Sequence, residues 1–254
     1  MDVMLDPQML LLLGAIAFAA GFIDTLAGGG GLITLPAMLL MQIPPIQAIA
    51  TSKMQSTFGA LVATITLIRK RQLTVSDVKL ACLASLIGAA LGALIVQFID
   101  PSALDILVPV VLVSIGLYFL LAPSAGSLER KPRIGDRAYR TFVVPVIGFY
   151  DGFFGPGTGS FFSLAEVALR GRNLIRATAS AKAMNLASNV ASLVVFIIGG
   201  KVLWTIGAVM AIGQLIGAYL GSMALIAGGA KLIRPLIVIV CFAMVGRYLY
   251  QNFA

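Results

Sequence analysis

Long uncharged apolar stretches, separated by short polar segments, dominate the chain. No charged side chain occurs in residues 9–23, 32–41, 80–99 or 106–122. An α-helix needs about 20 mostly apolar residues to cross a hydrocarbon core of about 30 Å. Only 11% of the 254 residues are charged, against about 25% in soluble domains. The pattern predicts an all-α polytopic membrane protein.

The first apolar segment contains an interruption. Residues 9–41 form a 33-residue run that contains one acid, Asp24, and four consecutive glycines at 28–31. One continuous helix would be about 50 Å long, and glycine is a poor helix former. We therefore expect a helix, a glycine turn and a second short helix. Broken backbone inside a membrane is tolerated only where protein buries it or a wet cavity borders it, so this segment is a candidate site.

The second half of the chain repeats the first. Residues 21–24 match 148–151, residues 50–53 match 179–182, and residues 86–92 match 215–221, the last two pairs at a spacing of 129. Several matches in order at a nearly constant offset indicate internal duplication. The predicted organisation is a first repeat at 1–122, a hydrophilic linker at 123–140 and a second repeat at 141–254.

Positive charge indicates how each repeat lies in the membrane, because cytoplasmic loops carry an excess of Lys and Arg. If each broken segment returns to the side it entered, 14 cations face one side and two face the other; a single crossing gives 11 against five. The first arrangement predicts two inverted repeats, each a broken or re-entrant pair plus three transmembrane helices, eight to ten helices in all. The linker would be cytoplasmic and the N-terminus periplasmic. Inverted repeats with paired broken helices are typical of transporters.

The remaining composition excludes several classes of site. The net charge is +8, but the cations lie in short loops between apolar runs, where they act as topology signals; we expect no nucleic-acid partner. The chain has no histidine, which excludes the common catalytic zinc sites. Cys82 and Cys241 lie inside apolar runs. We expect no metal and no cofactor.

Two lysines lie deep in the predicted helices. Lys53 is about 12 Å from the helix start at Pro45 by helical rise, and Lys182 has a similar depth. A buried charge costs a few kcal/mol, so it normally has a partner or a function. One interpretation is an ion pair within each repeat, Lys53 with Asp24 and Lys182 with Asp151. The other is that both lysines attract a small anion, and the two can coexist.

The residues around these lysines complete a candidate anion site. Backbone N–H groups at a glycine turn that begins a helix favour negative charge; the alternative is that the glycines only permit sharp turning. The aspartates could orient the turns, pair with lysine or carry a proton, and Gly88/Gly92 and Gly217/Gly221 favour close helix packing. The candidate binding residues are Lys53, Lys182, Gly29, Gly30, Gly31, Thr51, Ser52, Gln55, Gly157, Thr158, Gly159, Ser180, Asn185 and Asn189, with Asp24 and Asp151 as coupling or structural acids.

The two motifs resemble a known family. GFIDTLAGGGGLITLP followed by ATSKMQSTFG, and GFYDGFFGPGTGSFF followed by RATASAKAMNLASN, are similar to the sulfite and organosulfonate exporters of the TauE/SafE type. The resemblance extends from about Gly14 to Val245. It implies a multi-pass protein of a prokaryotic cytoplasmic membrane that moves sulfite, sulfonates or sulfoacetate.

The sequence therefore predicts a secondary transporter, an exporter by this resemblance, that alternates access around a midplane anion site. The chain would have the lipid bilayer and a small anion as partners and could form a homodimer. A passive anion channel of the same fold is the main alternative. An intramembrane aspartyl protease is disfavoured, because a lysine near each aspartate would keep both acids ionised; we expect no enzyme. Export and import use the same chemistry, so the residues alone do not separate them.

Overall fold

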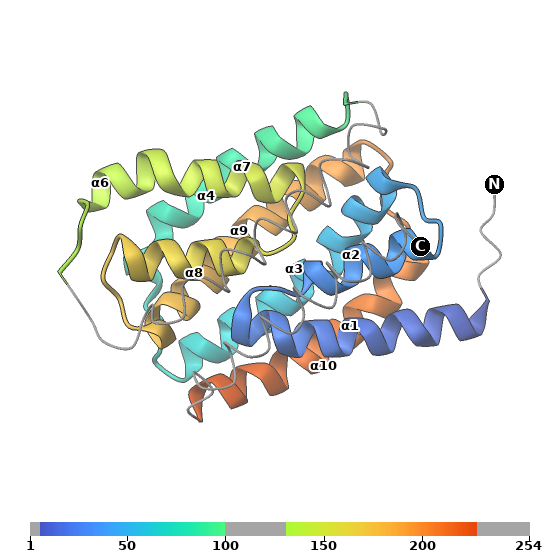
Figure 1. Ribbon diagram of the computed structural model, residues 1–254, viewed down its shortest axis with the longest axis horizontal. Helices are drawn as coiled ribbons and strands as arrows, with labels where there is room; N and C mark the ends of the chain where they lie inside the picture. Colours follow the sequence, from blue (N-terminus) through green and yellow to red (C-terminus); the bar gives the residue numbers. More distant parts are fainter. Residues whose placement is uncertain (1–5, 100–130, 228–254) are drawn as a thin grey trace, which may run out of the picture.

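The computed structural model describes residues 6–99 and 131–227, and every regular element in these ranges is a helix (Figure 1). The all-α prediction is confirmed. The apolar run at 106–122, Cys241 and the part of the second repeat after residue 227 lie outside the described residues. The helices are α1 (Pro7–Ala27), α2 (Gly31–Leu40), α3 (Pro45–Arg69), α4 (Val75–Val96), α6 (Asp136–Ala138), the π-helical turn η1 (Tyr139–Val143), α7 (Val144–Phe153), α8 (Thr158–Ala168), α9 (Leu174–Ile198) and α10 (Trp204–Ile226).

The predicted break in the first apolar segment is confirmed. Helix α1 ends at Ala27, the next residue, Gly28, has a φ of 76° in the left-handed region, and α2 begins at Gly31. The second repeat has the same design, since α7 ends at Phe153 and Gly157, with φ of 80°, precedes α8. Glycine adopts left-handed backbone more readily than residues that carry a Cβ. At ten residues, α2 is about 15 Å long, half the thickness of a hydrocarbon core.

The two repeats interlock. Helix α1 packs against α10, and α7 packs against α4, so the broken helix of each repeat lies on a helix of the other. In Figure 1 the equivalent helices α1 and α7 run in opposite directions, as do α3 and α9, and α4 and α10. This is the arrangement that inverted repeats require, and it supports that prediction. The sides of the bilayer on which the loops lie stay a prediction.

Glycines make the interlocked contacts possible. A Cβ at Gly88 or Gly92 would overlap the backbone of α7 at Pro145 or Phe149. In the other repeat, a Cβ at Gly217 would overlap the carbonyl of Phe18 on α1. The close helix packing predicted from the Gly-x-x-x-Gly spacings is therefore confirmed, and the helices that approach so closely come from different repeats.

The bundle differs between its outer surface and its centre. Among the described residues, α1, α4, α9 and α10 are long and apolar enough to cross a membrane. The outer face of α4 exposes large apolar side chains such as Leu83, Ile87 and Leu91. Toward the centre, α3 and α9 bury charged and polar side chains, among them Lys53 and Lys182. The bundle is therefore apolar outside and polar at its centre, which is the distribution expected of a protein that surrounds a polar site in lipid.

We predict that Gly92→Ala lowers the thermal stability of the purified protein. Alanine favours a helix interior by about 1 kcal/mol over glycine, but here its methyl group would force α4 away from α7, and such overpacking costs about 1–3 kcal/mol. Thermal unfolding in detergent should show a lower Tm for this variant. Gly135→Ala is the matched control, because no atom lies within 4 Å of its Cβ position. An unchanged or higher Tm for Gly92→Ala would contradict the packing argument.

Candidate functional site

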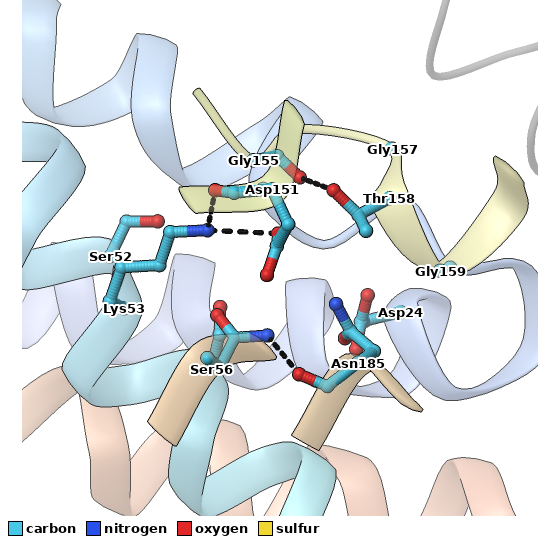
Figure 2. Close-up of a pocket in the computed structure, with 13 residues that line it drawn as sticks. Asp24, Ser52, Lys53, Ser56, Asp151, Gly155, Gly157, Thr158, Gly159 and Asn185 are labelled. Carbon is cyan, nitrogen blue, oxygen red and sulfur yellow. Dashed lines mark hydrogen bonds and ion pairs between the residues drawn. The ribbon is translucent and has the colours of Figure 1, made fainter. Parts of the chain in front are cut away.

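A small polar pocket lies where the two glycine turns meet α3 and α9 (Figure 2). Its wall consists of glycines and of charged, hydroxyl and amide side chains. The lining residues are Asp24, Gly28, Gly31, Ser52, Lys53, Ser56, Asp151, Gly155, Gly157, Thr158, Gly159, Asn185 and Asn189. Both repeats therefore contribute to a single pocket in the middle of the bundle.

Two buried ion pairs connect the repeats at this pocket. The Nζ of Lys53 lies 2.8 Å from Oδ1 of Asp151 and also donates to the backbone carbonyl of Asp151. The Nζ of Lys182 lies 2.6 Å from Oδ2 of Asp24. The pairing within each repeat, Lys53 with Asp24 and Lys182 with Asp151, was wrong. The pairs are crossed because each broken helix is packed into the other repeat, which brings its aspartate to the other repeat's lysine.

The crossed pairs leave the centre of the protein electrically balanced. Two lysines and two aspartates are present, and each of the four is less than a tenth exposed. Taking a charge out of water without a partner costs several kcal/mol, so each lysine stabilises one carboxylate. The pocket is therefore not a simple surplus of positive charge, as an anion site built from two free lysines would be.

The glycine turns lie against each other at the pocket. A Cβ at Gly28 would overlap the backbone of Gly159 and Ser160, and the hydroxyl of Ser160 donates to the carbonyl of Ala27. A Cβ at Gly155 would be 2.5 Å from Nζ of Lys53. The glycines thus permit both the sharp turns and the approach of Lys53. Binding of an anion by the N–H groups of the turns stays a prediction.

Polar groups hold each turn in place. The backbone N–H of Gly30 donates to Oδ1 of Asp24 over 3.1 Å, so Asp24 orients the first turn as well as pairing with Lys182. In the second turn, the hydroxyl of Thr158 donates to the carbonyl of Gly155 over 2.7 Å. Figure 2 shows the side chains of Lys53 and Asp151 directed toward each other across the upper part of the pocket.

The structure separates the predicted site residues into two groups. Those that line the pocket are Asp24, Asp151, Lys53, Gly31, Ser52, Gly157, Thr158, Gly159, Asn185 and Asn189. Those that do not are Lys182, Gly29, Gly30, Thr51, Gln55 and Ser180.

Three polar residues of the second group have other surroundings. The hydroxyl of Thr51 accepts a hydrogen bond from the N–H of Leu203 over 3.1 Å. The hydroxyl of Ser180 accepts one from Arg172 over 2.5 Å. Gln55 is completely buried, and its amide has no hydrogen-bond partner among the described residues. Thr51 and Ser180 therefore hold neighbouring segments together at some remove from the pocket.

Three lining residues, Gly28, Gly155 and Ser56, were not among the predicted site residues, and of these only Ser56 has a polar side chain. This serine follows Ser52 by one helical turn, so the two lie on the same face of α3. It also precedes Asn185 by the repeat spacing of 129. The duplication could therefore have pointed to Ser56, because its equivalent in the second repeat, Asn185, was among the predicted binding residues.

Comparisons with known proteins agree with this architecture. The family model described as sulfite exporter TauE/SafE matches residues 13–248. Over 249 residues the chain is 45% identical to the probable membrane transporter protein YfcA of Escherichia coli K12, covering 98% of this chain and 93% of that protein. It is 44% identical over 252 residues to a probable membrane transporter protein of Haemophilus influenzae, covering 99% and 98%. No solved structure matches the chain.

The family match extends over both broken segments and all the described helices except the first turns of α1. The relatives are aligned along nearly their whole length. The resemblance inferred from the paired glycine motifs is thereby confirmed, and the chain belongs to the sulfite exporter TauE/SafE family.

Proposed function

We propose that this protein is a secondary membrane transporter, an exporter of a small sulfur-containing anion such as sulfite or an organosulfonate. The observation that carries the proposal is the polar pocket around Lys53, formed by both repeats at the centre of an apolar bundle. The family and the names of the relatives support membrane transport. In this proposal the pocket opens alternately to the two sides of a bacterial or archaeal inner membrane, with the linker at 123–140 in the cytoplasm.

The donors around the pocket suit a compact oxyanion. Lys53 offers an ammonium group, Ser52 and Ser56 offer hydroxyls, and Asn185 and Asn189 offer amides. A sulfite or sulfonate group has three oxygens that each accept hydrogen bonds, and charged hydrogen bonds are the strongest of these. Donors from α3 and α9 approach from different repeats, so the anion would contact both repeats at once. Such a bridging position is the one required if relative movement of the repeats exposes the site alternately.

The ion pairs argue against proteolysis. An aspartyl protease needs two acids that share one proton, whereas Asp24 and Asp151 each pair with a different lysine. A passive anion channel uses the same donors as a carrier. Saturable uptake that accelerates when unlabelled anion is present on the opposite side would support the carrier, and single-channel currents would support the channel.

We predict that anions of this class stabilise the purified protein. Thermal unfolding should be measured with sulfite, thiosulfate, sulfoacetate, taurine and methanesulfonate, and with dimethyl sulfone as the neutral analogue of methanesulfonate. A ligand at 100 times its Kd stabilises the folded state by about 2.7 kcal/mol, so at least one anion should raise the Tm by several degrees and the sulfone should not. Equal stabilisation by the sulfone, or no stabilisation by any of these anions, would contradict the proposed substrate class.

We predict that the two ion pairs contribute differently to binding. The variant Lys53→Met/Asp151→Asn and the variant Lys182→Met/Asp24→Asn each remove one buried pair and leave the centre neutral, a change that proteins often tolerate. Only Lys53 lines the pocket, and losing a charged hydrogen bond costs about 1.5–3 kcal/mol. The first variant should therefore bind and transport labelled anion about ten- to a hundredfold more weakly than the second.

The assay for this prediction is uptake into proteoliposomes together with binding by calorimetry. Both variants must unfold cooperatively on heating, which shows that they are folded. Equal anion affinity in the two variants would contradict the role of Lys53.

A further inference from the structure

The two buried aspartates differ in what their carboxylate oxygens contact. Both oxygens of Asp24 have partners, because Oδ2 accepts from Lys182 over 2.6 Å and Oδ1 accepts from the N–H of Gly30 over 3.1 Å. Asp151 uses only Oδ1, which accepts from Lys53 over 2.8 Å. Its Oδ2 is buried and has no hydrogen-bond partner among the described residues. The two equivalent acids therefore differ in their hydrogen bonds, and only Asp151 has an unpartnered oxygen among the described residues.

The unpartnered oxygen belongs to the pocket. Asp151 is 1% exposed to solvent and lines the pocket wall. Figure 2 shows its carboxylate directed from α7 into the space above Ser56 and Asn185. A buried carboxylate oxygen without a donor is costly, and a proton on that oxygen would turn it into a donor aimed at a bound anion.

The charges that face Asp151 come from few elements. Lys53 on α3 is its direct partner. Asp24 on α1 lies in the same pocket wall, paired in turn with Lys182 of α9. The other lining groups from α3, α8 and α9 are uncharged, and α4 contacts α7 through Gly88 and Gly92. Tyr150, next to Asp151 on α7, donates its hydroxyl to the carbonyl of Pro156 over 2.6 Å.

Charge balance then limits how an anion can bind. The charges of the two lysines and two aspartates sum to zero, so a monovalent anion would leave one uncompensated negative charge in a buried site, which is strongly unfavourable. We propose that Asp151 takes up one proton when the anion binds and releases it when the anion leaves. This inference rests on the proposed function of the pocket. The anion and the proton then move together, and transport of a monovalent anion carries no net charge.

The proton that Asp151 takes up comes from water and returns to water. Water on the side to which the pocket is open supplies the proton, which bonds to Oδ2 of Asp151. The ammonium group of Lys53 keeps its three protons and redirects the N–H that faced Oδ1 to an oxygen of the anion. When the anion leaves, Oδ2 returns its proton to water, and the carboxylate of Asp151 pairs with Lys53 again.

Asp24 is unsuited to this role. A proton on Asp24 would weaken its bond from Lys182 or from Gly30, which orients the first turn. If Asp24 took up the proton, Lys182 would lose the negative charge that compensates it. Lys182 does not line the pocket, so an anion in the pocket could not take the place of that carboxylate. Asp24 is thus a positioning residue.

The test uses methanesulfonate, an anion that does not titrate near neutral pH. Calorimetry on the purified wild-type protein in buffers of different ionisation enthalpy should show one proton taken up per anion bound. Linkage to one proton makes the affinity fall about tenfold per pH unit on the alkaline side. Asp151→Asn should bind the anion with no proton uptake and with an affinity that does not change between pH 6 and pH 9. The double variant Lys182→Met/Asp24→Asn removes the other ion pair and keeps the centre neutral, so it should still take up one proton per anion bound and keep the pH dependence.

The wild-type measurement needs no variant, so it tests the inference even if a variant is unfolded. Wild-type binding without proton uptake would overturn this inference and leave the proposed function intact. Proton uptake that persists in Asp151→Asn, or that disappears in the Asp24 variant and not in Asp151→Asn, would also overturn it. No methanesulfonate binding by the wild type at any pH would overturn the proposed function and this inference together.

Discussion

The crossed ion pairs are the interaction on which the centre of this protein depends. Lys53 and Lys182 lie deep in helices that pack among apolar ones, where a lone ammonium group would be strongly unfavourable. Each is compensated by an aspartate from the opposite repeat, at the end of a helix that the glycine turn terminates. The ion pairs, the broken helices and the interlocked packing are therefore one arrangement, since removing any of them leaves a buried charge without its partner.

Local features of the sequence predicted much of this arrangement. The run of four glycines could not continue a helix, so the break between α1 and α2 followed from backbone chemistry alone. Lys53 and Lys182 were identifiable because a charge inside an apolar run is expensive wherever its partner lies. The glycines at 88, 92, 217 and 221 predicted close helix contacts for a similar reason, namely that small residues permit backbone approach.

Features that depend on the relative position of distant helices were not predictable in this way. The partners of the lysines are set by the packing of α1 on α10 and α7 on α4, which no short-range pattern encodes. The division of α3 into lining and non-lining residues has the same origin. Neighbouring residues on a helix point about 100° apart, so Ser52 and Ser56 face the pocket while Gln55 does not. Amino-acid composition does not determine how α3 is rotated about its own axis, and therefore does not determine which of its residues face the pocket.

The long sequence separation of the crossed pairs has a consequence for biosynthesis. Lys53 and Asp151 are 98 residues apart in the chain, and Lys182 and Asp24 are 158 apart. At about 5–20 residues per second during translation, Lys53 leaves the ribosome roughly 5–20 s before its partner is made. Neither half can reach its final packing while the other is missing. During that interval Lys53 has no aspartate of the second repeat to pair with, so its burial as an ion pair can be completed only after α7 has been synthesised.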